Sequence, residues 1–279
     1  MKAIRYQKYG SPDVLQMEEV EIPVPKENQV LIKIHASSIN AADYHMRRAK
    51  PVLIRPMIGG LLRPKDPRLG SDVAGRVEAV GANVKQFRPG DEVFGFTSGA
   101  FAEYACSREG AVAMKPANIS FEEAAAVPVG AITALQGLRD AVGVRPGQKV
   151  LIQGASGSVG IFAVQLAKVF GAEVTAVCST RNLDMARCLG ADHVIDYTRE
   201  DFTRSGQHYD VIFAVNGYHS LLAYQRALKP QGIYVCAGGT MPQIFEALLV
   251  GSLISRMVGK KMRSMGIAKV NQEDLINLG

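Results

Sequence analysis

The pattern of hydrophobic and polar positions changes character partway along the chain. In the first part, β-branched or alternating stretches at residues 2–6, 30–36, 72–80 and 91–94 are bounded by glycine or proline. Such stretches are typical of strands that end at turns. Few helical patterns interrupt them, so the sequence predicts a mostly-β domain over residues 1–118.

Beyond residue 118 helical and strand patterns alternate. Ser120 and Glu123 form a capping-box pattern before an alanine-rich helix, and a second helix is predicted over residues 132–141. The strands predicted after it cover residues 149–153, 173–178, 193–196, 210–215, 232–237 and 261–267. Strands separated by helices favour a parallel sheet covered on both faces, and this number of strands fits the doubly wound Rossmann fold. The predicted fold class is therefore α/β, with the Rossmann domain over residues 119–279.

Composition narrows the classes of protein that fit. Of 279 residues, 47% are hydrophobic and 21% charged, which is ordinary for a globular protein. The net charge of +6 is spread along the chain, so we expect no nucleic-acid partner. The longest apolar run, residues 124–135, contains Pro128 and is shorter than the about 18–20 residues of a membrane span. Four scattered cysteines and no signal-peptide pattern predict reduced thiols and a cytoplasmic location.

The most specific motif is a glycine-rich stretch between a predicted strand and a predicted helix. Glycines at spacing three allow a tight turn and let the backbone approach a pyrophosphate closely. The N-terminus of the following helix adds free N–H groups and a partial positive charge. A glycine motif in this context predicts dinucleotide binding. The expected contacts are Gly154, Ala155, Ser156, Gly157, Ser158, Val159 and Gly160.

The end of the next predicted strand bears on which dinucleotide binds. NAD sites usually carry an acidic residue there, whereas this chain has Ser179, Thr180 and Arg181. Hydroxyl groups and a guanidinium suit a 2′-phosphate, so the sequence favours NADPH. Further cofactor contacts are expected from residues that follow the other strands: Tyr197, Asn216, Gly217, Ala237, Gly238 and Gly239.

Together these features resemble the medium-chain dehydrogenase/reductase superfamily, and within it the zinc-free NADPH:quinone oxidoreductase branch. The motifs that carry the resemblance are residues 9–15, 37–43, 70–75, 89–93 and 154–160. The resemblance implies a GroES-like domain followed by a Rossmann domain, with the active site between them.

The resemblance also assigns roles to residues of the first domain. Zinc-dependent relatives have Cys at the position of Asn40 and His at the position of Ser71, so we expect no metal here. By resemblance, Asn40 and Asp43 line the nicotinamide and substrate side, and Thr133 lies near the nicotinamide. Tyr44 is either a proton donor to the substrate or a packing residue.

A zinc-free site favours substrates that accept hydride with little help from a Lewis acid. Quinones and α,β-unsaturated carbonyls are such electrophiles, so the expected activity is NADPH-dependent reduction of a small molecule of either class. Two alternatives stay open: a zinc-free alcohol dehydrogenase or enoyl reductase, and a non-catalytic NADPH-binding protein of the crystallin type. Relatives of this kind commonly form homodimers or homotetramers.

The end of the chain departs from the family pattern. By resemblance, family members return after the Rossmann domain to complete the first domain. Here a helical pattern over residues 272–278 is followed directly by Gly279. We therefore expect the return segment to be missing, with apolar surface and a strand edge exposed in the first domain.

Overall fold

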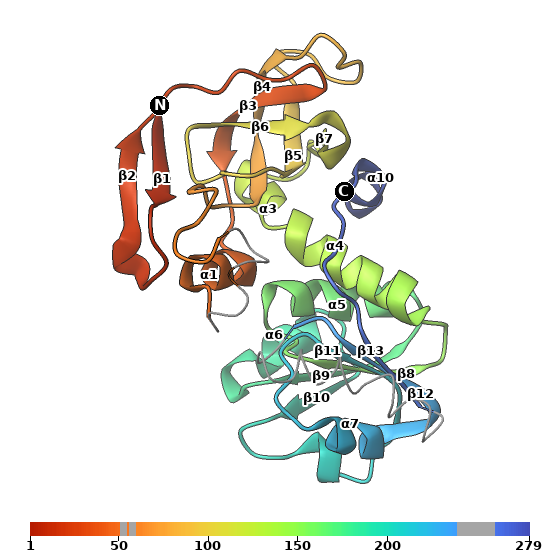
Figure 1. Ribbon diagram of the computed structural model, residues 1–279. Coiled ribbons are helices and arrows are strands. Elements are labelled where there is room, and N and C mark those ends of the chain that lie inside the picture. Colours follow the sequence, from red (N-terminus) through yellow and green to blue (C-terminus); the bar gives the residue numbers. More distant parts are fainter. Residues whose placement is uncertain (51–54, 56–59, 239–259) are drawn as a thin grey trace. The chain divides into compact units, whose positions relative to one another are not determined.

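The computed structural model describes residues 1–50, 55, 60–238 and 260–279, so the predicted cofactor residue Gly239 lies outside the described residues. The chain divides into two compact units: Met1–Val129 with Lys269–Gly279, and Gly130–Ala268 (Figure 1). The division falls after Val129 rather than after residue 118. The last residues group with the first unit, although the sequence placed them in the second domain.

Unit 1 is built around an antiparallel five-stranded sheet, as the strand patterns predict. Its strand order is β6-β3-β4-β5-β7. The bounds are β3 (Gln29–Ala36), β4 (Asp72–Val80), β5 (Glu92–Phe96), β6 (Tyr104–Arg108) and β7 (Val112–Met114). A separate hairpin joins β1 (Lys2–Tyr6) and β2 (Leu15–Glu19). Val30, Ile32, Val73 and Val93 are fully buried in the core of the sheet.

Short helices complete unit 1. They are α1 (Ala41–Arg48), α3 (Phe121–Ala125) and α10 (Gln272–Leu278). The predicted capping box starts α3, since Glu123 N donates to Ser120 Oγ (3.1 Å) and Ser120 N donates to Glu123 Oε2 (2.8 Å). α10 packs against β7 and buries Leu275. The C-terminal helix α10 thus belongs to unit 1, and the absence of the family's longer return segment stays a prediction.

Unit 2 contains the predicted parallel sheet, with strand order β10-β9-β8-β11-β12-β13. The bounds are β8 (Lys149–Gln153), β9 (Glu173–Cys178), β10 (His193–Asp196), β11 (Tyr209–Ala214), β12 (Leu228–Cys236) and β13 (Lys261–Ser264). The fifth strand starts at Leu228, before the predicted residue 232. The second predicted helix is α4 (Pro128–Gln136), which continues into a π-helical turn over Gly137–Val142.

Helices cover both faces of this sheet, so its strands are apolar on both sides. Val150 and Ile152 of β8 pack in one cluster with α5 (Ser158–Val169) and α6 (Leu183–Cys188). Leu151 packs in the other cluster with α7 (Leu221–Ala227). This arrangement brings the loops after parallel strands to one edge of the sheet, where ligands of such folds bind.

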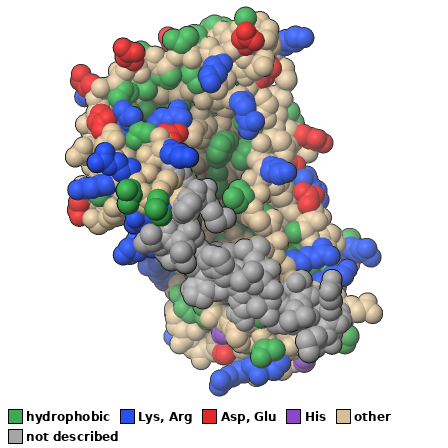
Figure 2. Space-filling model, in the orientation of Figure 1, with side chains coloured by type: hydrophobic (Ala, Val, Ile, Leu, Met, Phe, Trp, Pro, Cys, Tyr) green, Lys and Arg blue, Asp and Glu red, His purple; other side chains and the backbone are tan. Residues whose placement is uncertain are grey.

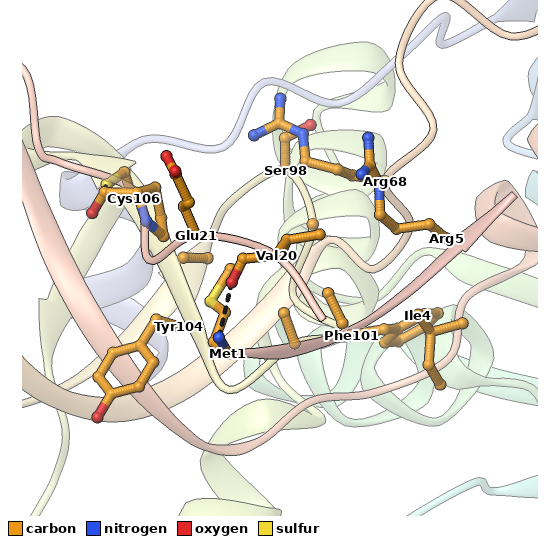
Figure 3. Close-up of a pocket in the computed structure, with 15 residues that line it drawn as sticks. Met1, Ile4, Arg5, Val20, Glu21, Arg68, Ser98, Phe101, Tyr104 and Cys106 are labelled. Atoms are coloured by element: carbon orange, nitrogen blue, oxygen red, sulfur yellow. Dashed lines mark hydrogen bonds between the residues drawn. The ribbon is translucent and has the colours of Figure 1, made fainter. Parts of the chain in front are cut away.

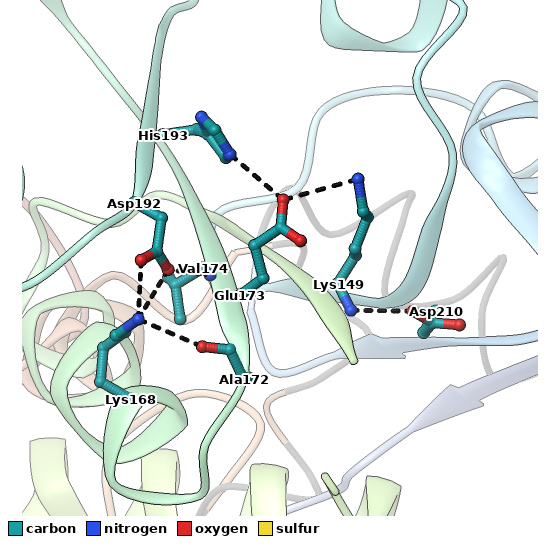
Figure 4. Close-up of polar contacts among 8 residues, drawn as sticks. All are labelled: Lys149, Lys168, Ala172, Glu173, Val174, Asp192, His193 and Asp210. Carbon is teal, nitrogen blue, oxygen red and sulfur yellow. Dashed lines mark hydrogen bonds and ion pairs between the residues drawn. The ribbon is translucent and has the colours of Figure 1, made fainter. Parts of the chain in front are cut away.

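The opposite end of the sheet, where the parallel strands β8, β9 and β10 begin, carries ionic contacts (Figure 4). Glu173 Oε1 lies 3.1 Å from His193 Nε2 and 3.5 Å from Lys149 Nζ. Lys168 Nζ pairs with Asp192 at 2.8 Å. These side chains are exposed enough for solvent to screen them, and exposed pairs contribute at most about 1 kcal/mol each. We therefore assign this edge to stability and not to a ligand site.

On the face shown in Figure 2, Lys and Arg side chains are dispersed among acidic and neutral ones. Across the described ranges, no helix has both the length and the apolar character needed to cross a membrane.

Candidate functional site

The glycine loop after β8 is held by its own backbone. Gly154 has φ +81°, and the N–H groups of Gly154 and Ala155 both donate to Val177 O at 3.1 Å. A Cβ at Gly160 would lie 2.1 Å from Gly154 O, so only glycine fits there. α5 begins immediately after Gly157, and the first N–H groups of a helix have no partner within the helix. The loop can therefore offer backbone donors to an anion.

The residues expected around a 2′-phosphate differ in how they are bonded. Thr180 Oγ1 donates to Asp196 Oδ2 at 2.5 Å, so the proton of this hydroxyl is already committed. Ser179 Oγ accepts from the Asn182 amide at 3.1 Å. Arg181 is exposed and makes no hydrogen bond or ion pair within the described part of the chain. Ser179 and Arg181 thus keep donors available for a ligand.

Asp196, the last residue of β10, places a carboxylate beside this segment that the sequence analysis missed. It also accepts from Thr198 N (3.0 Å) and Thr198 Oγ1 (2.7 Å), and it lies 3.5 Å from Arg199 Nε. Hydrogen bonds from the Thr180 and Thr198 hydroxyls lower the pKa of this carboxyl. These hydrogen bonds and the nearby Arg199 guanidinium stabilise the negative charge of the Asp196 carboxylate.

A pocket of about 250 Å³ opens beside the glycine loop. It is lined by Gln153, Gly154, Val177, Tyr197, Asn216 and Tyr218. The predicted residues Tyr197 and Asn216 therefore meet Gly154 here. Gln153 and Tyr218 were not predicted, and the only signal for Gln153 was a polar residue that ends a buried strand.

Other predicted residues gather at the same edge of the sheet. Gly217 N donates to Gly238 O at 3.4 Å, which joins the loops after β11 and β12. Ala237 N donates to Ala214 O at 2.9 Å. Thr133 is half-buried on α4, and three residues earlier a Cβ at Gly130 would lie 2.5 Å from Ser158 Oγ, so α4 approaches the start of α5.

In unit 1, Asn40 and Asp43 are joined at the start of α1. Both are buried. Asn40 N donates to Asp43 Oδ2 at 2.8 Å, and Gly70 N donates to Asp43 Oδ1 at 3.1 Å. The Asp43 carboxylate therefore fixes both the first turn of α1 and the segment before β4.

Asp72 is the centre of this cluster, and the sequence analysis did not select it. Its Oδ2 accepts from Asn40 Nδ2 (2.9 Å) and Ser38 Oγ (2.5 Å), and its Oδ1 accepts from Val129 N (3.0 Å). Burial raises the pKa of Asp72 and of Asp43, and the nearby Asp43 charge raises that of Asp72 further. The carboxylate fixes the direction of the Asn40 amide.

Tyr44 lies on α1 close to this cluster in the chain and is 44% exposed. The hydroxyl accepts a hydrogen bond from Arg48 Nη1. The guanidinium groups of Arg47 and Arg48 lie 5.8 and 5.1 Å from the centre of its ring. Tyr44 therefore combines an available hydroxyl proton with a positive environment.

Another pocket, of about 230 Å³, lies in unit 1 between β1 and β6 (Figure 3). Arg5 pairs with Glu18 at 3.1 Å and Arg68 pairs with Asp66 at 2.6 Å. Burial raises the pKa of the Cys106 thiol, which disfavours the reactive thiolate. Because Arg5 and Arg68 of this pocket are already paired, we place the candidate site elsewhere.

Comparison with known proteins finds a family match in each part of the chain. Residues 26–117 match the family described as alcohol dehydrogenase GroES-like domain, and residues 158–275 match the zinc-binding dehydrogenase family. The chain is 43% identical over 227 residues to 2-methylene-furan-3-one reductase of Solanum lycopersicum. That match covers 76% of this chain and 56% of the tomato enzyme, so the chain spans little more than half of that relative.

Two solved structures share the fold. The quinone oxidoreductase from Coxiella burnetii superposes with a TM-score of 0.87 at 30% identity, covering 100% of this chain and 86% of that one. The Escherichia coli quinone oxidoreductase complexed with NADPH superposes with a TM-score of 0.81 at 26% identity, covering 99% and 85%.

Proposed function

The chain belongs to the medium-chain dehydrogenase/reductase superfamily, in its quinone oxidoreductase-like branch, and from this we propose that it reduces quinones or α,β-unsaturated carbonyls with NADPH. The observation that carries the proposal is the glycine loop, where Gly160 packs against Gly154 O too closely for any side chain. The relatives named for quinones and for 2-methylene-furan-3-one support this substrate class. When bound, the cofactor supplies the hydride.

The choice of NADPH over NADH rests on the charges near Ser179. Arg181 is a cation without a partner among the described residues. The neighbouring Asp196 is shielded by the hydroxyls of Thr180 and Thr198. A 2′-phosphate would thus meet an available guanidinium, which is a good phosphate partner.

The donor set of unit 1 does not fit a zinc ion, and we propose that the reaction proceeds without one. The Asn40 amide nitrogen donates to Asp72, and Ser71 offers a neutral hydroxyl where zinc-dependent relatives have His. Among the described residues, no group of three or more His, Cys, Asp or Glu side chains is arranged to hold a metal ion.

On the substrate side, we assign Tyr44 the role of donor to the oxygen of the acceptor. Arg48 already donates to its hydroxyl, which leaves the tyrosine proton free for an acceptor oxygen. Negative charge that develops on that oxygen would be stabilised by the guanidiniums of Arg47 and Arg48. Asn40 and Asp43 keep α1 in place beside it.

Two measurements test this function. NADPH and NADH are titrated into the purified protein, and the fluorescence of the reduced nicotinamide is followed, with no Trp in the chain to interfere. NADPH should bind at least about tenfold more tightly, a difference of about 1.4 kcal/mol. NADPH oxidation is then measured with a quinone, an enone and a simple ketone, with and without a chelator.

We expect turnover with the quinone or the enone, little with the ketone, and no effect of the chelator. Equal binding of NADH would contradict the assignment of Arg181. Tight NADPH binding without turnover on any acceptor would favour the non-catalytic alternative. Turnover of the ketone that the chelator abolishes would contradict the zinc-independent reaction.

A further inference from the structure

One segment of unit 1 holds as much net positive charge as the whole chain. Between Tyr44 and Lys65 there are six Lys or Arg residues and no Asp or Glu, while the net charge of the complete chain is +6. The structure describes all six, and none of them forms an ion pair with any residue that it describes. They are Arg47, Arg48, Lys50, Arg55, Arg63 and Lys65. Because like charges repel, an anion at this segment would be stabilising.

Arg47 is the buried member of this group, with only 7% of its surface exposed. Its Nη1 donates to the neutral carbonyl of Gly10 at 2.5 Å. Its Nε and Nη2 form no hydrogen bond within the described part of the chain, and they are not among the fully buried polar atoms of the molecule. Arginine is rarely buried unless it is paired, and the C-terminus of α1 offers only a partial negative charge. Arg47 therefore keeps donors for an anion.

The turn after α1 brings a second guanidinium close to the end of this helix. Ala49 is fully buried with φ +45°, a conformation that few residues other than glycine adopt. In this turn Ala49 O accepts from Arg55 Nε at 3.2 Å, and Arg55 Nη1 donates to Leu61 O at 3.3 Å. The nitrogen Nη2 of Arg55 forms no hydrogen bond with a described residue and is not fully buried. Arg55 thus also keeps a donor while its other nitrogens hold it in place.

Arg47 and Arg55 contact two adjacent residues. Arg47 binds the carbonyl of Gly10, and the Arg55 guanidinium lies 4.8 Å from the centre of the Tyr9 ring. Because Tyr9 and Gly10 are neighbours in the chain, both guanidiniums approach the same short stretch of backbone. Their contacts are with carbonyls and a ring, so neither charge is neutralised. A carboxylate matches the planar donor fork of a guanidinium.

Arg48 connects this charge to the residue that we assign to the acceptor. Its Nη1 donates to the hydroxyl of Tyr44, and its guanidinium lies 5.1 Å from the centre of the Tyr44 ring. The Arg47 guanidinium lies 5.8 Å from the centre of the same ring. An acceptor whose oxygen meets the Tyr44 hydroxyl would therefore have these cations beside its other substituents.

We propose that the acceptor carries a carboxylate, which Arg47 and Arg55 bind while the carbonyl oxygen of the acceptor faces Tyr44. Arg55 is then a residue that determines specificity. The inference rests on the proposed function, because it takes the position of the acceptor from Tyr44, and it narrows the quinones and enones to anionic ones.

The test compares 4-oxopent-2-enoate with its methyl ester, the same α,β-unsaturated ketone with and without a negative charge. The C=C bond of each is reduced by the hydride of NADPH and a proton from water, which gives the saturated ketone and NADP⁺. The acid preference is kcat/KM for the acid divided by kcat/KM for the ester. Comparing this preference between variants cancels the intrinsic reactivity of the two acceptors.

In Arg55→Gln the acid preference should fall at least about tenfold, the effect of one lost hydrogen bond to a charged group. The kcat/KM for the ester should stay unchanged. Arg55→Lys keeps the charge and should retain most of the preference. In the wild type the preference should also fall as salt is added, because salt screens the attraction.

The matched control is Arg108→Gln, which removes the same charge from an exposed position on β6. The Arg108 side chain forms no hydrogen bond or ion pair with a described residue, so this variant should leave the acid preference unchanged. Thermal melting checks that each variant is folded.

An equal acid preference in the wild type and in folded Arg55→Gln would overturn the inference alone, since reduction of both acceptors leaves the proposed function standing. An equal loss of rate with both acceptors would do the same. If neither acceptor is reduced, the proposed function fails, and calorimetry with 4-oxopentanoate and its methyl ester then tests the carboxylate site by itself. Binding of the acid that Arg55→Gln weakens would support the site, and binding that it leaves unchanged would overturn it.

Discussion

The glycine loop of unit 2 and the carboxylate cluster of unit 1 are built in different ways. The loop is a run of neighbouring residues shaped by the backbone, with Gly154 and Gly160 in direct contact. The cluster joins Asp72 to Asn40, 32 positions away, and to Val129, 57 positions away. A local motif can therefore be read from sequence, whereas a centre of distant side chains becomes visible only in the folded chain.

The largest effect on stability and NADPH binding should come from Gly160→Ala, which disrupts the glycine loop. The new Cβ would meet Gly154 O at 2.1 Å, and neither backbone segment can yield easily. We expect a loss of about 3 kcal/mol in unfolding free energy, the upper part of the usual range for overpacking, together with loss of NADPH binding. Urea unfolding and nicotinamide fluorescence measure the two effects.

Gly157→Ala is the matched control for this change. Gly157 has φ −83°, and the nearest atom to its Cβ would be Gly154 O at an ordinary 3.6 Å. Its unfolding free energy should stay within about 0.5 kcal/mol of the wild type. Equal destabilisation by both substitutions would contradict the tight contact at Gly160.

The contrast between a local motif and a cluster of distant side chains also explains how much of the fold and of the site could be predicted from the sequence. The strand alternation and the glycine spacing specify the sheet of unit 2, and the Ser120 capping box is a local pattern. The packing of α10 on β7 could not be predicted from sequence, because it joins segments far apart in the chain. Asp72 was missed because one acid inside a strand pattern gives no sign of its partners.

The next effect tests the cluster through Asp72→Asn. An amide at this position keeps the shape but turns a donor toward the N–H and O–H groups of Asn40, Val129 or Ser38. A buried group left without a partner costs about 1–3 kcal/mol, so we expect a loss of about 2 kcal/mol in unfolding free energy, with slower turnover. Asp184→Asn, in an exposed ion pair with Arg187, is the control and should change stability little.

The substitution Arg181→Ala should weaken NADPH binding and leave the stability of the fold unchanged. Because Arg181 is exposed and has no partner among the described residues, the unfolding free energy of the variant should differ from that of the wild type by less than about 0.5 kcal/mol. NADPH affinity should fall about tenfold, roughly 1.4 kcal/mol, while NADH affinity stays the same. Arg187→Ala on α6 is the matched control. Equal weakening of both cofactors by Arg181→Ala would argue against contact with the 2′-phosphate.

The contributions of Asp72 in unit 1 and Asp196 in unit 2 to the unfolding free energy should change with pH in opposite directions. The pKa of Asp72 is raised from its ordinary 3.8, so its contribution to stability is complete below 3.8 and is lost as the pH rises through the folded-state pKa. The pKa of Asp196 is lowered, so its contribution is complete above 3.8 and is lost as the pH falls through the folded-state pKa.

The difference in unfolding free energy between the wild type and each Asp→Asn variant measures these contributions. The advantage of the wild type over Asp72→Asn should shrink as the pH rises above 3.8. Its advantage over Asp196→Asn should shrink as the pH falls below 3.8. Parallel curves for the two variants would show that burial and hydrogen bonding do not separate the regions as described.

The smallest effect is expected at the edge of the sheet opposite the loop (Figure 4). Glu173→Gln removes pairs with Lys149 and His193, but all three side chains are exposed enough for water and salt to screen them. The unfolding free energy should fall by less than about 1 kcal/mol, and NADPH binding should not change. Asp192→Asn should cost more, because Asp192 Oδ2 also accepts from Val174 N at 2.7 Å. If Glu173→Gln weakened NADPH binding, the two edges of the sheet would be coupled, and the assignment of function to the loop edge alone would fail.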